Sequence, residues 1–170
     1  MKNIILVIFV CLITGCAAKV KQSVTTSNIT SGSMPSSILL DIQPSRTITR
    51  STDLSKSMLE LNKLIAKEYR GDVLKGNTSN QAEVSVNITV EHFRYVSGFG
   101  RFMTGVMAGD AELKLNVQLL DSMTNEVISE SVFDTRSEFS EGIFGVTTSR
   151  QLQALSKEIV NLINSSGKRV

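Results

Sequence analysis

Strict alternation of apolar and polar residues marks two strands in the second half of the chain. Valine and isoleucine alternate with polar residues over positions 84–90, and alanine, leucine and valine do so over 111–119. A period of two places one face of each strand in a core. A turn at 121–125 then leads into a third strand, 127–135, which completes a hairpin. The facing of this third strand is ambiguous, because its apolar residues occur on both parities.

Two other segments have the apolar spacing of an α-helix. The first is capped by Thr52 or Asp53 and ends at Gly71. Its apolar stripe recurs at steps of three and four: Leu54, Met58, Leu61, Ile65 and Tyr69. The second helix spans 149–165, where Thr148 and Gln151 have the spacing of a capping box. Its stripe is formed by Leu152, Leu155, Ile159, Leu162 and Ile163.

A further apolar run at 38–43, ended by Pro44, predicts a strand before the first helix. The order is then β-α-β-β-β-α. We expect an α+β fold with an antiparallel or mixed four-stranded sheet and both helices packed on one face. Phe93 and Tyr95 break the parity of their strand, which predicts either a bulge or a covered far end. His92 continues the buried parity, so we interpret it as a structural, hydrogen-bonded histidine rather than a general base.

The N-terminal residues have the pattern of an export signal. Lys2 precedes an almost unbroken apolar run over 4–13. About ten residues are too few to cross a bilayer core of about 30 Å, but suit a signal peptide. The run ends in Ile13-Thr14-Gly15-Cys16, which resembles the lipobox of bacterial prolipoproteins. We predict cleavage before Cys16 and lipidation of its thiol; the alternative is an ordinary signal peptide that happens to contain a cysteine.

These features divide the chain into a signal peptide (1–15), a lipidated cysteine with a flexible tether (16–37) and one α+β domain (38–167). The tether is predicted from its Ser, Thr, Asn and Gly content, which offers little surface to bury. Cys11 and Cys16 are the only cysteines, so the mature chain has no disulfide. Ala17 stands where an aspartate typically retains lipoproteins in the inner membrane, which favours the outer membrane, facing the periplasm.

Two glycine-bearing segments, 97–109 and 139–146, are unusually apolar for loops. One interpretation is that the first folds back over the open end of its own core. The other is a surface for an envelope partner, a lipid or a second copy of the chain. The candidate partner-binding residues are Phe99, Arg101, Phe102, Met103, Met107 and Phe144.

The chain resembles an uncharacterised bacterial lipoprotein family, domain of unknown function 4410, over roughly residues 35–165. The resemblance rests on a glycine-and-arginine loop, a following strand at 113–119 and a turn. The matching residues are Gly98, Gly100, Arg101, Gly105, Gly109 and Asp121-x-x-Thr124-Asn125-Glu126-Val127. Asn125 departs from the family's usual glycine, but asparagine tolerates the left-handed conformation that the turn needs. The resemblance implies an outer-membrane lipoprotein domain with no known enzymatic activity.

Catalytic and cofactor motifs are missing from the sequence. It has one histidine and neither a G-x-S-x-G motif nor zinc-type cysteine spacing. After removal of Lys2 the charges nearly balance, with 17 basic and 16 acidic residues, and no basic stripe indicates nucleic acid. We therefore expect no enzyme, no cofactor and no metal. The predicted function is that of an assembly or accessory subunit of an envelope complex; the alternative is a periplasmic ligand-binding module for a lipid or cell-wall fragment.

Overall fold

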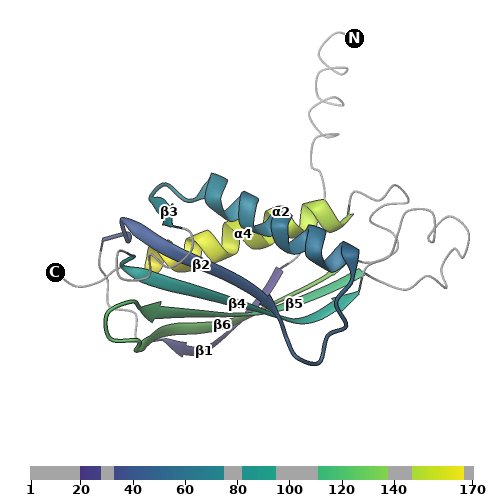
Figure 1. Ribbon diagram of the computed structural model, residues 1–170, viewed down its shortest axis with the longest axis horizontal. Helices are drawn as coiled ribbons and strands as arrows, with labels where there is room; N and C mark the ends of the chain where they lie inside the picture. The colour runs from purple at the N-terminus through teal and green to yellow at the C-terminus, as the bar shows by residue number, and fades with distance from the viewer. Residues whose placement is uncertain (1–19, 28–32, 75–81, 95–110, 138–146, 167–170) are drawn as a thin grey trace, which may run out of the picture.

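The structure, a computed structural model, describes residues 20–27, 33–74, 82–94, 111–137 and 147–166. In this part of the chain, six strands form one twisted sheet and two long helices lie side by side on one of its faces (Figure 1). The strands are β1 (Val20–Ser27), β2 (Ser37–Pro44), β3 (Asp72–Leu74), β4 (Val84–Arg94), β5 (Ala111–Asp121) and β6 (Val127–Ser137). The helices are α2 (Thr52–Glu68) and α4 (Thr147–Ser165).

The sheet has the strand order β1-β6-β5-β4-β2-β3 and is mixed. Strands β1, β6, β5 and β4 pair with their neighbours in antiparallel fashion, whereas β2 lies parallel to both β4 and β3. As a result, three strands (β2, β4 and β6) finish at one end of the sheet. The other two long strands, β1 and β5, begin at that same end. Both helices also begin at this end (Figure 1).

The predicted α+β class and the placement of both helices on one face are confirmed, but the prediction of four strands is wrong. The sheet has two further strands, β1 and β3. Strand β1 runs through the segment predicted as a flexible tether, so residues 20–27 belong to the folded sheet. Its side chains are mostly exposed, and pairing with β6 over Val20–Ser27 holds it in place. Hydrogen bonding of the backbone needs no apolar pattern, which is why composition alone missed this strand.

The core lies between the sheet and the two helices. The inward positions of β4 and β5 are the alternating apolar residues predicted for them, and they are almost fully buried. The sequence left open which face of β6 points into the core. Phe133 is fully buried, so its face is the inward one, and the other inward residues are the small Ser129, Ser131 and Thr135. These hydroxyls do not stay unpaired: Ser129 donates to the Thr26 carbonyl at 3.3 Å.

The helix termini differ from those predicted. Ser51, rather than Thr52 or Asp53, caps α2, because its hydroxyl accepts the backbone N–H of Leu54 at 3.1 Å. The helix ends at Glu68, before Gly71. Gly71 is instead packed so closely that an added Cβ would lie 2.5 Å from the Ser36 carbonyl oxygen.

Helix α4 begins at Thr147, two residues before the predicted start, so a capping box from Thr148 is wrong. Gln151 has another role. Its side-chain amide donates to the carbonyl of Ala111 at 3.2 Å, which joins the first turn of α4 to the first residue of β5.

The turn between β5 and β6 has the predicted left-handed residue. Asn125 has φ 57°, and its N–H donates to the Asp121 carbonyl at 2.8 Å. The Asp121 carboxylate also accepts the N–H groups of Met123 and Thr124, at 2.9 and 3.1 Å. The aspartate and the asparagine together fix the hairpin.

Candidate functional site

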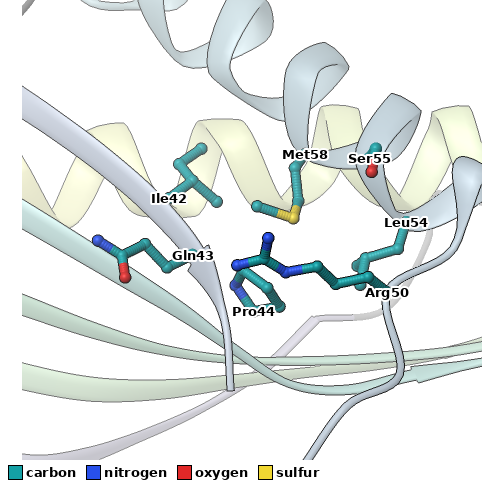
Figure 2. Close-up of a pocket in the computed structure, with 7 residues that line it drawn as sticks. All are labelled: Ile42, Gln43, Pro44, Arg50, Leu54, Ser55 and Met58. Atoms are coloured by element: carbon teal, nitrogen blue, oxygen red, sulfur yellow. The ribbon is translucent and has the colours of Figure 1, made fainter. Parts of the chain in front are cut away.

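A groove opens where the outer half of β2 passes beneath the first turns of α2. Strand β3 pairs only with Ser37–Leu39 at the start of β2, so no strand among the described residues covers the outer edge of β2 beyond that point. The resulting hollow has a volume of about 360 Å³. It is lined by Ile42, Gln43, Pro44, Arg50, Leu54, Ser55 and Met58 (Figure 2).

The groove combines apolar walls with one cation. The side chain of Arg50 extends across it, and the guanidinium points toward Pro44 and Met58 (Figure 2). Gln43 and Ser55 add neutral hydrogen-bonding groups at the rim. The lining contains no carboxylate, histidine or thiol, so the groove itself offers no general acid, base or nucleophile of those kinds. Its apolar walls and single guanidinium match the chemistry of an anionic amphiphile.

Four exposed arginines lie around the end of the domain at which the helices begin, and we name it the arginine end. Arg46 and Arg50 belong to the link between β2 and α2, Arg94 is the last residue of β4, and Arg150 lies in the first turn of α4. The sequence shows no basic stripe because these four residues come from three separate segments. The strand order is what gathers them at one end.

Beside the arginine end, the open face of the sheet carries two ion pairs. Glu91 lies 2.8 Å from Lys114, and His92 lies 3.2 Å from Glu112. The hydrogen bond and the charge of Glu91 raise the pKa of Lys114. Among the described residues no group of three or more His, Cys, Asp or Glu side chains is arranged to hold a metal ion. The two ion pairs are therefore best explained as cross-strand contacts on a solvated face.

The predicted burial of His92 is wrong. A bulge between Val90 and His92 shifts the register of β4 against β5, so that His92 faces Lys114 on the open side. The His92 side chain is 54% exposed. The same shift turns Phe93 inward to pack against the core, which confirms the bulge that its parity had indicated.

The functional residues that we predicted from the sequence lie outside the described part of the chain. They are Cys16, Phe99, Arg101, Phe102, Met103, Met107 and Phe144. The described residues that flank the two glycine-bearing segments are nevertheless placed together, since Arg94 pairs with Glu112 and Ala111 pairs with Ser137. The described residues on both sides of the first segment, at the end of β4 and the start of β5, therefore lie at the arginine end, as do the end of β6 and the start of α4 on either side of the second.

None of the helices within the described ranges is long and apolar enough to span a membrane.

A two-helix layer on one face of a mixed sheet defines a small α+β domain. The family described as a domain of unknown function, DUF4410, matches residues 46–167, and the chain belongs to this family. The resemblance predicted from the glycine loop and the hairpin is thereby confirmed. No curated protein sequence gives a significant match.

Solved structures share the fold at low sequence identity. A variant of PelC from Paraburkholderia phytofirmans, solved as a dodecamer, is 15% identical, with 87% of this chain and 99% of that chain covered and a TM-score of 0.56. The hypothetical protein CT253 from Chlamydia trachomatis is 8% identical, with 75% and 98% covered and a TM-score of 0.51. At such identities the likeness concerns the fold alone.

Proposed function

We propose that this chain is a lipid-anchored, non-enzymatic accessory or assembly subunit of a cell-envelope complex, held at the outer membrane and facing the periplasm. The observation that carries the proposal is the position of β1. Val20, the first residue of the sheet, comes only four residues after Cys16. Four extended residues span at most about 14 Å. A domain acylated at Cys16 is therefore held close to the lipid surface rather than at the end of a long tether.

Assembly into a larger complex is supported by the edge of the sheet. Strand β1 has β6 on one side, and it is the last strand of the sheet on the other. Its exposed residues include Val24, which is 58% exposed, and Lys21 is its one charged residue. An edge with a single charged side chain is suited to pairing with another chain. PelC, which shares the fold, is a dodecamer.

The proposal is tested by the chemical state of Cys16 in the native protein and by the proteins that crosslink to β1. Mass spectrometry of the protein purified from its own envelope should show a chain that begins at Cys16 with acyl groups on that residue. A Cys16→Ser variant should leave the membrane fraction. A photo-crosslinker at Val24, compared with one at the exposed Leu59 on α2, should capture a second protein or a second copy. An unmodified thiol, or equal yields at both positions, would contradict the proposal.

A second candidate function, binding of a lipid or cell-wall fragment, is favoured by the groove. Its apolar walls and the Arg50 guanidinium fit a ligand that has an apolar part and a carboxylate or phosphate. A fluorescent fatty acid should bind, and Arg50→Gln should weaken binding about tenfold or more, since hydrogen bonds to charged groups contribute about 1.5–3 kcal/mol. Met58→Trp should block the groove, while Lys63→Gln on the exposed side of α2 should have no effect. Equal binding by all variants excludes the groove as the site.

A further inference from the structure

The two ends of the domain differ in charge. Around the arginine end, Arg46, Arg50, Arg94 and Arg150 are exposed, and none of them forms an ion pair with another described residue. The described acidic residues nearby are Asp53 in the first turn of α2, the pair Glu91 and Glu112, and Asp134, which lies opposite Lys114 and Lys21. Those two glutamates already face Lys114 and His92. Among the described residues, this end therefore has more positive than negative charge.

Among the described residues, the opposite end is acidic. It is formed by the end of α2, the start of β3, the residue before β4 and the β5–β6 turn. Its charged residues are Lys67, Glu68, Arg70, Asp72, Glu83, Asp121 and Glu126. The described residues thus place positive charge at one end of the strands and negative charge at the other, although the net charge of the chain is close to zero. A dipole orients a protein even where the net charge does not attract it.

The backbone reinforces the positive end. Helices α2 and α4 both begin there, with 17 and 19 residues respectively (Figure 1). Each helix contributes about half a positive charge at its N-terminus. These partial charges add to the arginine side chains and favour an anionic partner at the same end.

The chain reaches this end from Cys16. Val20 pairs with Thr135 near the last residues of β6, so β1 starts at the arginine end. An acyl group on Cys16 would hold this end, and not the acidic end, within about 14 Å of a bilayer.

From these observations we propose that the arginine end docks on the anionic phospholipid headgroups of the bilayer that carries the anchor, through Arg46, Arg50, Arg94 and Arg150. The inference deepens the proposed lipid anchoring and rests on it for the identity of the surface. In this orientation the strands run roughly away from the membrane, and the acidic end and its β5–β6 turn are presented to the periplasm.

The experiment measures vesicle binding without the acyl chain. The chain from residue 16 onward with Cys16→Ser contains every described element and carries no lipid. It should sediment with vesicles of phosphatidylcholine mixed with phosphatidylglycerol, but not with phosphatidylcholine alone, and added salt should release it. Neutralising one arginine near a membrane surface should weaken binding about fivefold, so Arg46→Gln, Arg50→Gln and Arg94→Gln combined should weaken it about a hundredfold.

Two matched variants control for total charge and for folding. Lys63→Gln, Lys67→Gln and Arg70→Gln remove the same charge from exposed positions on and after α2, away from the arginine end, and should change binding less than about twofold. Replacing the three arginines with lysine should preserve binding, since headgroup attraction depends on charge. Circular dichroism checks that each variant folds.

The proposal is overturned if the wild-type chain does not distinguish the two kinds of vesicle, or if both glutamine triples lose binding equally. Retention on a soluble anionic polysaccharide without retention on anionic vesicles would also overturn it. If vesicle binding fails, the proposed acylation of Cys16 still stands, because mass spectrometry tests it separately. Conversely, an unmodified Cys16 with intact vesicle binding would remove the anchor but not the basic docking surface.

Discussion

The side-chain amide of Gln151 lies 3.2 Å from the carbonyl oxygen of Ala111 and is the contact that ties the start of α4 to the start of β5. Both residues are 2% exposed. Removing the amide takes this donor from a buried carbonyl, so Gln151→Ala should lower the free energy of unfolding by about 1–3 kcal/mol. Urea denaturation measures the change. The exposed neighbour Gln153 is the control, and Gln153→Ala should fall within about 0.5 kcal/mol of wild type.

Strand β1 should be part of the cooperative fold. Replacing residues 20–27 with a Gly-Ser segment of equal length should lower the free energy of unfolding by more than about 2 kcal/mol. The backbone groups that pair with β6 are kept, but each glycine loses about 0.5–1 kcal/mol more conformational entropy when it is fixed in a strand, which weakens the pairing. A chain whose unfolding midpoint is unchanged after the replacement would show that these residues are a tether after all.

Gly71 should tolerate no side chain. A Cβ at this position would lie 2.5 Å from the Ser36 carbonyl oxygen and 2.8 Å from the ring of Tyr69. Because a backbone oxygen cannot move aside without shifting the start of β2, Gly71→Ala should cost about 1–3 kcal/mol. The adjacent Arg70 is exposed, and Arg70→Ala serves as the control in thermal denaturation. Equal melting temperatures for the two variants would contradict the close packing.

Tyr69 should titrate at unusually high pH. Its hydroxyl donates to the Pro35 carbonyl, and burial, followed by the charges of Glu83 and Asp72, raises its pKa from 10.0 to about 12. Folding therefore favours the neutral phenol, so this contribution to stability is complete below pH 10 and is lost as the pH rises through about 12. Tyr95→Phe leaves Tyr69 as the only tyrosine. Ultraviolet titration of that variant should give a midpoint near 12, and a midpoint near 10 would contradict the burial.

Asn125 should be replaceable by glycine but not by a β-branched residue. Its φ of 57° is open to glycine without strain, whereas valine in the left-handed region is strained by about 1–2 kcal/mol. We expect Asn125→Gly to keep or slightly raise the melting temperature and Asn125→Val to lower it. Two variants of equal stability would show that the turn can change its conformation.

The sequence predicted those elements whose side chains decide their structure. The inward residues of β4 and β5, such as Val86 and Leu115, alternate, and the stripe from Leu54 to Ile65 recurs at helical steps, because each buries one apolar face. Strand β1 was missed because its backbone, rather than its side chains, attaches it to β6. His92 was placed on the wrong face because a single extra residue in a bulge reverses every later side chain.

The candidate site was harder to predict, because it depends on which ends of separate segments meet. Arg46, Arg94 and Arg150 are far apart in the chain, and only the order of the strands brings them to one end. The groove beside Arg50 exists because β3 is only three residues long. The pattern of apolar residues in the sequence does not predict the length of so short a strand. Cys16 and the residues chosen in the two glycine-bearing segments remain predictions.

The pairing of Val20 with Thr135 also sets the order in which the domain can be completed. Strand β1 is made before its partner β6, which lies more than a hundred residues later in the chain. Strand β1 therefore cannot join the sheet until the chain has been made as far as β6. Contacts this distant in sequence slow folding. Until β6 is available, residues 20–27 lack the strand with which they pair.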